Sequence, residues 1–492
     1  MLSFKKLDEG QYEKGQGKKI GRELPYFITI VTLLAASGLG PYTILQKIRE
    51  INLLPVIRQE SIKILKRIDM LGVDPLTALN QAKDRPSSKA LGEFLTGYVS
   101  AIQSGGNVLN YLKSKMYSTF ERLQNEEKSS VEKISGVVHA YLTMQIVILA
   151  VFILVASIGA TPLQGFLANP QAANSNPPYV ILLFPPMMSV MFIVIAKSMV
   201  RSNFPELEFK KVLKFALPSV IIGIVLVLSN IFSSMQANAY VVGASLIAAS
   251  IWPTLKFKKI YVANMDAEAA TPQILRDITE ARKAGIGPEK CIVHACKRTD
   301  YKTFNTITNS IANKLEWGIP INNIFDALRN ELNNFQVLIS FRILFEVIFS
   351  GGGNVNTLDT LADTSERVYN IEKNKRDMLK PYMMVGFMVV IITGFTTLLT
   401  IDSFSQINEE KRIGNTNTGP NAETQKFMQM ISIAVLVQGW LAGLFVGKIT
   451  RGVYSGGFVY CIMYTIVSII SIFVIQSHII NISSILKSSP PT

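Results

Sequence analysis

The sequence predicts an all-α membrane protein with seven transmembrane helices and two homologous cytoplasmic helical bundles. Three observations lead to this fold class: an apolar composition, a series of long apolar runs and an internal repeat. Hydrophobic residues make up 49% of the 492 residues, charged residues only 17%, and the mean hydropathy is +0.30. Soluble domains carry more charge than this, so we expect much of the chain to lie in a bilayer.

Seven apolar runs have roughly the 20-residue length that a helix needs to cross a bilayer. They are Val137–Ala160, Pro178–Ala196, Phe215–Ser234, Tyr240–Leu255, Pro381–Ile401, Phe427–Gly447 and Val453–Gln476. A further run, Leu24–Ala36, covers only about 13 residues, which is typical of a buried core helix or an interfacial segment. It follows a basic stretch and has no Ala-x-Ala-like site, so we do not expect a signal peptide there.

Basic residues are distributed unevenly among the segments between these runs. Four segments carry net positive charge and together account for the whole formal charge of +14. These segments are residues 1–136, residues 197–214, residues 256–380 and the link that holds Lys448 and Arg451. Because basic residues stay on the cytoplasmic side, we expect the N-terminus inside the cell and the C-terminus outside.

This topology divides the chain into six segments. They are a basic, flexible N-terminal arm (1–22), a cytoplasmic helical domain (23–135), four transmembrane helices (136–256), a second cytoplasmic helical domain (257–380), three transmembrane helices (381–478) and an external tail (479–492). The membrane rule explains the basic excess without nucleic acid. We expect no nucleic-acid binding, because the sequence contains no zinc finger and no basic strand interleaved with aromatic residues.

The two cytoplasmic segments repeat one another at a spacing of about 247 residues, which indicates an internal duplication. The first copy reads SGLGP at Ser37–Pro41, LGVDPLTALNQA at Leu71–Ala82 and SGGN at Ser104–Asn107. The second copy reads AGIGP at Ala284–Pro288, WGIPINNIFDAL at Trp317–Leu328 and SGGGN at Ser350–Asn354.

Each landmark of the repeat predicts a helix break. Glycine accepts the left-handed backbone that ends a helix, and proline suits the first turn of the next. The break residues are Gly38, Gly40, Pro41, Gly72, Gly105, Gly106 and Asn107 in the first copy, and Gly285, Gly287, Pro288, Gly318, Gly351, Gly352 and Asn354 in the second.

A long helix is expected to follow the last break in each copy. Leu109, Leu112, Met116, Phe120 and Leu123 recur at the helical period after the first, and Val355, Leu358, Leu361 and Val368 do so after the second. Such a stripe predicts that the helix packs on the bundle and then feeds into a membrane span. Within the sixth span, Gly439, Gly443 and Gly447 are spaced by four, which predicts close approach of a neighbouring helix.

The duplicated Gly-x-Gly-Pro turn, the Leu-Gly-x-x-Pro-like helix start and the SGGN break resemble the F-type domains of type II secretion systems. Two spaced-out domains with seven spans are more similar to the archaeal branch, the platform proteins of the archaellum and its pilus relatives. The resemblance implies a platform in the cytoplasmic membrane that meets a hexameric ATPase and guides pilin-like or archaellin subunits into a filament. It also implies contact with membrane lipids and, beside a six-fold partner, a dimer at most.

The sequence lacks the motifs of common enzymes. It has no phosphate-binding Gly-x4-Gly-Lys-Ser/Thr loop, no His-Glu-x-x-His and no Gly-x-Ser-x-Gly. Cys291, His294 and Cys296 lie close together, but their spacing fits no standard zinc pattern, so we expect structural residues there. We therefore expect no catalytic residue, no metal and no cofactor.

Two alternatives stay open: a multi-spanning transporter, and an export platform of the type II secretion kind. Pro185-Pro186 and Pro218 interrupt predicted spans, as broken helices do in transporters. The interiors of the spans, however, lack Asp, Glu, Lys and Arg, and transport usually needs such charged residues.

If an ATPase docks, basic residues of the two cytoplasmic domains are the natural contacts, because they pair with acidic surfaces. The candidates are Arg49, Arg58, Lys63, Lys66 and Arg67 in the first domain, and Arg276, Arg282, Lys283, Lys297, Arg298 and Arg329 in the second. A solvated surface, or attraction to anionic lipid, is the competing interpretation of any one of them. Charge reversal of Arg282 and Lys283 is predicted to weaken ATPase binding.

Overall fold

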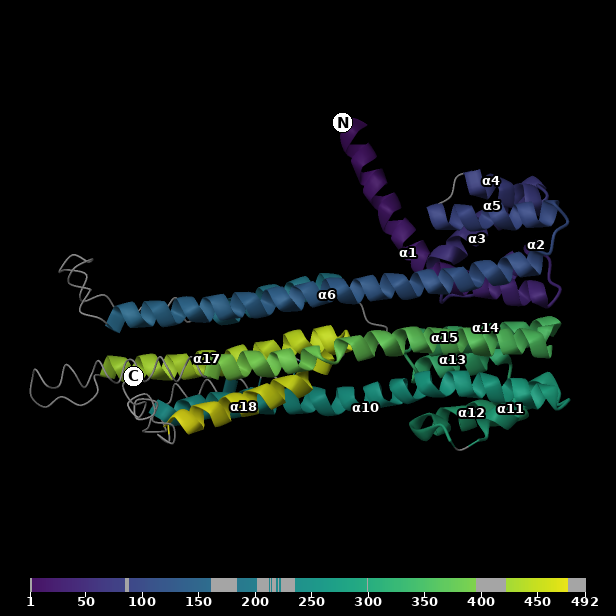
Figure 1. Cartoon of the computed structure of the whole chain (residues 1–492). Helices are drawn as coiled ribbons and strands as arrows, with labels where there is room; N and C mark the ends of the chain where they lie inside the picture. The colour runs from purple at the N-terminus through teal and green to yellow at the C-terminus, as the bar shows by residue number, and fades with distance from the viewer. Residues whose placement is uncertain are drawn as a thin grey trace, which may run out of the picture. The chain divides into compact units, whose positions relative to one another are not determined.

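The computed structural model describes residues 2–84, 88–160, 184–200, 235–298, 300–394 and 422–476, with a few single positions between 212 and 222. Every regular element in these residues is a helix (Figure 1). The chain divides into two compact units. The repeat unit comprises Met1–Ser129 and Tyr261–Lys375, and the membrane unit comprises Ser130–Ile260 and Arg376–Thr492.

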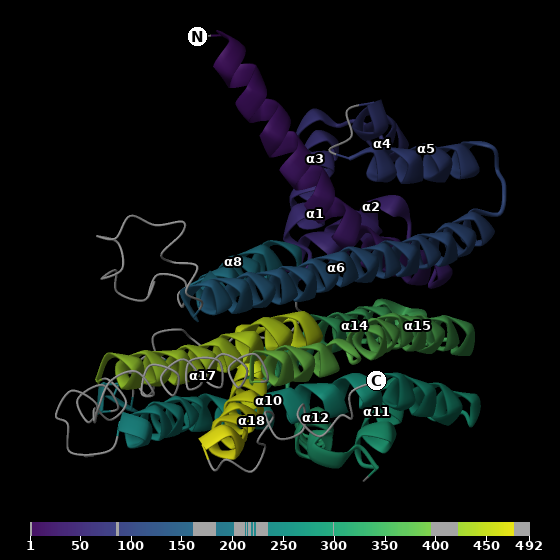
Figure 2. The same ribbon diagram turned by 60° about the vertical axis from the view of Figure 1, so that its left-hand side comes forward.

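In its described residues, the repeat unit contains the same succession of six α-helices twice, and the second copy has two short additional elements, η3 and η4. The first copy holds α1 (Leu2–Ala36), α2 (Pro41–Arg49), α3 (Pro55–Leu71), α4 (Pro75–Asp84), α5 (Lys89–Gln103) and the start of α6 (Val108–Ala160). The second holds the end of α10 (Met235–Lys283), α11 (Pro288–Cys296), η3 (Lys302–Phe304), α12 (Asn305–Glu316), α13 (Ile321–Glu331), α14 (Phe335–Val347), η4 (Ile348–Gly352) and α15 (Val355–Leu379). Both views show α4 alongside α5 (Figures 1 and 2).

The helix breaks lie where the sequence predicts them. Gly38 and Gly285 both have φ near +85°, a backbone conformation that side chains with a Cβ rarely adopt. The next glycine in each copy is extended, and Pro41 and Pro288 then open α2 and α11, which both have nine residues. The shared Gly-x-Gly-Pro pattern thus produces the same turn twice.

The later breaks also correspond between the copies. Gly72 and Gly318 have φ of +64° and +69°, and Gly105 and Gly351 have φ of +65° and +81°. Asn107 then caps α6, since its Oδ1 accepts the Asn110 N–H at 3.0 Å, and Asn354 caps α15 through the Thr357 N–H at 2.8 Å. Both long helices therefore begin at the predicted residues, Val108 and Val355.

The apolar run Leu24–Ala36 forms the buried part of α1. Phe27, Ile28 and Leu34 are among its residues in the hydrophobic core of the repeat unit, so of the two structures expected for this run it forms the core helix. The helix α1 begins at Leu2, inside the stretch expected to be a flexible arm, and the flexibility of that arm stays a prediction.

A carboxylate on α1 caps a neighbouring helix. The N-terminal flanking residue of α3 is Leu54, which has no side chain able to accept a hydrogen bond. Glu23 takes this role, because its carboxylate accepts the N–H groups of Val56 and Ile57 at 3.1 and 2.8 Å. Burial raises the pKa of Glu23, while these two hydrogen bonds act in the opposite direction.

The two copies share one hydrophobic core within the repeat unit. Tyr26 of the first copy meets Phe335 of the second edge to face, with ring centroids 5.1 Å apart. At the rim of this contact, Lys375 pairs with Glu127 at 2.7 Å. Because α14 lies against α1 as well as α13, its side chains are buried on all sides, whereas α5 of the first copy keeps an exposed face.

The predicted spans fall within the residue ranges of the membrane unit, although three of the helices that carry them begin or end in the repeat unit. Within the described residues, five helical stretches are long and apolar enough to cross a bilayer: Val108–Val151, Asn238–Lys283, Val355–Gly394, Gln429–Arg451 and Tyr454–Val474. They contain described parts of five of the seven predicted spans, as expected of a multi-pass membrane protein. The predicted span Pro178–Ala196 overlaps the shorter apolar helix α8 (Phe184–Met199), and Phe215–Ser234 lies mostly outside the described residues, so the count of seven stays a prediction.

Three glycines of α17 (Ala422–Arg451) face its partners in the membrane unit. A Cβ on Gly443 would overlap the backbone of Cys461 in α18 (Phe458–Gln476), and one on Gly447 would overlap Gly457 of η5 (Tyr454–Gly457). Gly439 lies against the Ser468 hydroxyl, at 2.6 Å from the position of a Cβ. This is the close approach that the four-residue spacing predicts.

A buried group of polar side chains links α6, α8 and α17 within the membrane unit. The Ser189 hydroxyl lies 3.0 Å from the Tyr141 hydroxyl and accepts hydrogen bonds from the Gln145 and Gln438 amides at 3.3 and 2.9 Å. All four residues are buried. Such bonds join helices in an environment where water cannot compete for the polar groups.

Two glycines of the first copy should respond in opposite ways to alanine. Gly38→Ala is expected to lower the free energy of unfolding of the repeat unit by about 1 kcal/mol, because alanine is strained at φ of +85°. Gly21→Ala, in the interior of α1 with open space around it, should raise this free energy by about 0.5–1 kcal/mol. Denaturant unfolding of the full chain in detergent measures both, and equal shifts would contradict the prediction.

The contact between α17 and α18 should tolerate no added methyl group at its centre. Gly443→Ala is expected to cost about 1–3 kcal/mol, since the clash is with backbone that cannot move aside. Gly136→Ala in α6 is the control, because nothing lies within 4 Å of its added Cβ. Melting temperature and monodispersity in detergent report the difference, and indistinguishable variants would argue against the close contact.

Candidate functional site

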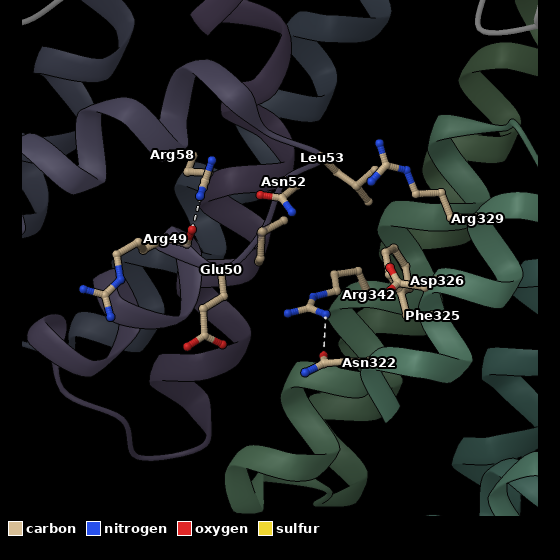
Figure 3. A pocket seen from close by; sticks show the side chains of 11 residues that line it. Arg49, Glu50, Asn52, Leu53, Arg58, Asn322, Phe325, Asp326, Arg329 and Arg342 are labelled. Carbon is tan, nitrogen blue, oxygen red and sulfur yellow. Dashed lines mark hydrogen bonds between the residues drawn. The ribbon is translucent and has the colours of Figure 1, made fainter. Parts of the chain in front are cut away.

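The two copies of the repeat enclose a cleft with a volume of about 540 Å³ (Figure 3). Most of its lining side chains are polar or charged, and four of them are arginines. The first copy contributes Arg49, Glu50, Ile51, Asn52, Leu53 and Arg58, and the second contributes Asn322, Phe325, Asp326, Arg329 and Arg342. We call this feature the arginine cleft.

The first wall of the arginine cleft is the turn between α2 and α3. Arg49 is the last residue of α2, and Arg58 lies in the first turns of α3. The Nε of Arg58 donates to the backbone carbonyl of Arg49 at 2.7 Å, across the short connection. The turn therefore holds the Arg58 guanidinium in place and leaves its terminal nitrogens for other partners.

The second wall is one face of α13. Asn322, Phe325, Asp326 and Arg329 recur at spacings that place them on the same side of a helix. The aromatic ring of Phe325 is buried beneath the Arg342 guanidinium, whose carbon lies 5.5 Å from the ring centroid. The surface offered to the cleft is consequently polar, with Asp326 and Arg329 exposed.

Arg342 forms the floor of the cleft and is only 8% exposed. Its Nη2 donates to Glu346 at 2.5 Å and its Nη1 to Asn322 at 3.2 Å, whereas its Nε has no hydrogen-bond partner among the described residues. Glu346, equally buried, also lies 3.5 Å from the Lys47 ammonium of the first copy. The Glu346 carboxylate thus interacts with a cationic side chain from each copy.

The structure brings together three of the eleven basic residues that the sequence suggests as docking contacts. Arg49, Arg58 and Arg329 all line the arginine cleft, although Arg49 and Arg329 are 280 positions apart in the sequence. Figure 3 shows Arg49 and Arg58 on helices of the first copy, opposite Arg329 and Arg342 of the second.

The other eight candidates lie outside the cleft. Five pair with nearby carboxylates on the surface: Lys63 with Glu60, Arg276 with Glu366, Lys283 with Glu280, Lys297 with Glu316 and Arg298 with Asp277. Lys66 and Arg67 lie on α3. Arg282 differs from all of these, since it donates to the backbone carbonyls of Gly353 and Ile286 at 2.7 and 3.0 Å and so joins α10 to the break before α15.

Sequence reasoning missed Arg342. The residue stands in an otherwise apolar stretch, FQVLISFRILFEV, where a charge is costly unless it is paired. The signal was Glu346 four residues later, at the spacing that brings an arginine and a carboxylate together on one helix. Docking candidates selected from clusters of basic residues do not include this isolated pair.

The cysteine and histidine cluster has the features of structural residues. Cys291 and Cys296 are buried in the core, whereas His294 is exposed. Burial raises the pKa of both thiols, that of Cys296 to about 12, which disfavours the thiolate that metals and nucleophilic chemistry require. In the described part of the chain, no group of three or more His, Cys, Asp or Glu side chains is placed to hold a metal ion.

Comparison with known proteins agrees with the duplicated architecture. The profile of the family described as type II secretion system (T2SS), protein F matches residues 27–156 and 274–401, more than half of the chain. The chain belongs to this family. Each matched segment covers most of one copy of the repeat and extends into the apolar segment that follows it, so the resemblance predicted from the helix-break motifs is confirmed.

A curated relative of the F-family chain is an uncharacterized protein of Methanocaldococcus jannaschii. The two are 19% identical over 413 residues, which cover 77% of this chain and 67% of the relative. No solved structure matches the chain.

Loss of the carboxylate charge should destabilise the fold far more at the buried pair beneath the cleft than at a pair on the surface. Glu346→Gln leaves the Arg342 guanidinium buried without its counter-ion and is expected to destabilise the repeat unit by about 3 kcal/mol. Glu280→Gln removes the exposed partner of Lys283 and should cost less than about 1 kcal/mol.

Denaturant midpoints of the full chain in detergent distinguish the two substitutions. The double variant Arg342→Met with Glu346→Leu should recover part of the loss, because it leaves no unpaired charge in the core. Equal midpoints for Glu346→Gln and Glu280→Gln would show that Glu346 does not hold the two copies together.

Proposed function

We propose that this F-family chain is the membrane platform of an archaeal type IV filament machine, an archaellum or an adhesive pilus. In this role it docks a cytoplasmic hexameric ATPase and couples that enzyme to the insertion of pilin-like or archaellin subunits. Membership in the T2SS protein F family, the apolar helices and a relative from an archaeon support the proposal.

The observation that carries the proposal is the continuity between the repeat and the apolar segments. The helix α6 runs without a break from its Asn107 cap in the first copy to Ala160 in the membrane unit. In the second copy, α15 leads through Lys380 and Pro381 to the helical residues 382–394. A partner that binds the repeat unit therefore has a direct mechanical connection to helices of the membrane unit.

The charge distribution supports the orientation of the platform. We propose that both copies of the repeat lie in the cytoplasm, with the N-terminus inside and the C-terminus outside, because the basic segments belong on the cytoplasmic side. Their basic residues also favour contact with anionic lipids. The platform is expected to hydrolyse no nucleotide by itself and to assemble as a dimer at most beneath a six-fold partner.

Purification of the tagged full chain from native membranes tests this role. The ATPase and a pilin-like subunit are expected to come with it, and light scattering of the purified platform should give a monomer or a dimer. An export platform of the type II secretion kind, which the family description favours, would instead bring a secreted substrate. Solute uptake by reconstituted vesicles, with no ATPase recovered, would identify a transporter and refute the proposal.

The arginines of the cleft should matter more for ATPase recovery than other basic residues do. Arg49→Glu combined with Arg329→Glu is expected to lower the recovered ATPase about tenfold, because reversed charges repel an acidic partner. Lys89→Glu combined with Lys290→Glu is the matched control, with one exposed residue changed in each copy and the same change in net charge.

Arg282 is less suitable for this test, although the sequence suggests it. Reversal of its charge would remove the hydrogen bonds to Gly353 and Ile286 and disturb the fold. Lys283→Glu alone leaves those bonds intact and should weaken ATPase recovery if α10 contributes to docking. Unchanged recovery with the cleft variant, at normal thermal stability, would exclude the cleft as a docking site.

A further inference from the structure

We propose that the arginine cleft binds an acidic peptide segment of the cytoplasmic partner, whose Asp and Glu carboxylates bridge arginines of the two copies. That the ATPase supplies this segment rests on the proposed function, whereas the binding chemistry of the cleft does not. The proposal follows from the charge, the hydrogen-bonding groups and the volume of the cleft.

The charge of the lining favours an anion. Besides Arg342, which pairs with Glu346 beneath the cleft, three arginines face two acids, Glu50 and Asp326, so the cleft carries an excess of positive charge. Arg49 and Arg329 make no hydrogen bond or ion pair with another side chain in the described part of the chain. Like charges on opposite walls repel each other, and an anion between them would remove that repulsion.

The floor of the cleft contains a donor that no described residue satisfies. Arg342 is more than nine-tenths buried and commits its two terminal nitrogens to Glu346 and Asn322, but its Nε has no partner in the described residues. An unpaired buried donor is costly, and a nearby anion would reduce that cost. The planar guanidinium fork suits carboxylates, which it can bind through two parallel hydrogen bonds.

The remaining groups favour a peptide over a free phosphate compound or an apolar helix. Glu50 and Asp326 would repel a compact, highly charged phosphate, whereas they can accept N–H groups of a peptide backbone. The amides of Asn52 and Asn322 can both donate to and accept from such a backbone. Phe325 lies beneath Arg342, so the cleft offers little apolar surface to a hydrophobic partner.

The size of the cleft fits this occupant. A volume of about 540 Å³ is within the range of pockets that enclose small ligands, so the cleft can take a few residues of an extended segment. Its walls come from α2–α3 of the first copy and from α13 of the second. A bound segment would therefore link the two copies in addition to the contacts they already share.

Binding of a fluorescent hexaglutamate peptide to the full chain in detergent, with no ATPase present, tests the proposal. Fluorescence anisotropy is expected to show saturable binding that weakens as salt rises, whereas hexaglutamine should not bind. Arg58→Gln combined with Arg329→Gln should weaken hexaglutamate binding about tenfold or more, since one charged donor is lost from each wall. The matched control, Lys89→Gln with Lys290→Gln, should change the affinity by less than about twofold.

Further variants separate the cleft from general charge and from misfolding. Arg49→Gln with Arg329→Gln spares the hydrogen bond from Arg58 to the Arg49 carbonyl and should weaken binding as well. Arg58→Lys with Arg329→Lys keeps the charge but removes the fork, so an intermediate affinity is expected. Circular dichroism melts identify any variant that fails to fold.

Three outcomes would overturn the proposal. Equal loss in the cleft variants and the lysine control would mean that net charge alone attracts the peptide. Wild-type affinity in folded cleft variants would place the binding elsewhere, and inorganic pyrophosphate that binds more tightly than hexaglutamate would identify a phosphate site. Peptide binding at the cleft without ATPase recovery from membranes would leave the inference intact and refute the proposed function.

Discussion

The burial of α14 between α13 and α1 is the contact on which the repeat unit depends. A helix with apolar side chains on every side cannot be covered by one copy of a small bundle. The apolar segment of α1 closes the remaining side, and Tyr26 and Phe335 meet where the two copies join. The duplication therefore yields two copies that form one core, and their arrangement within this unit follows from hydrophobic burial.

The polar features at the edge of that core follow from the same packing. Arg342 and Glu346 belong to α14, so they are carried into the interior with it and must pair with each other. Lys47 reaches the same carboxylate from the first copy. The arginine cleft lies above this pair, so its walls are set by the contact of the two copies and not by either copy alone.

Different forces hold the membrane unit. In a bilayer, apolar side chains gain little by leaving lipid, so helices associate through close packing and internal hydrogen bonds. The glycines of α17 permit contact with the backbone of α18, and the group of Tyr141, Gln145, Ser189 and Gln438 joins three helices. Because α6 belongs to both units, the hydrophobic core of one and the polar contacts of the other act on a single helix.

Local chemistry alone determined the helix breaks, the duplication and the five apolar stretches. Gly38, Gly285, Asn107 and Asn354 act on their own neighbours, so their effect can be predicted without the rest of the chain. The cap that Glu23 provides for α3, the burial of α14 on all sides and the meeting of Arg58, Arg329 and Arg342 were decided only by the tertiary structure. These contacts join residues tens to hundreds of positions apart, and no local pattern records which distant surfaces a folded chain will bring together.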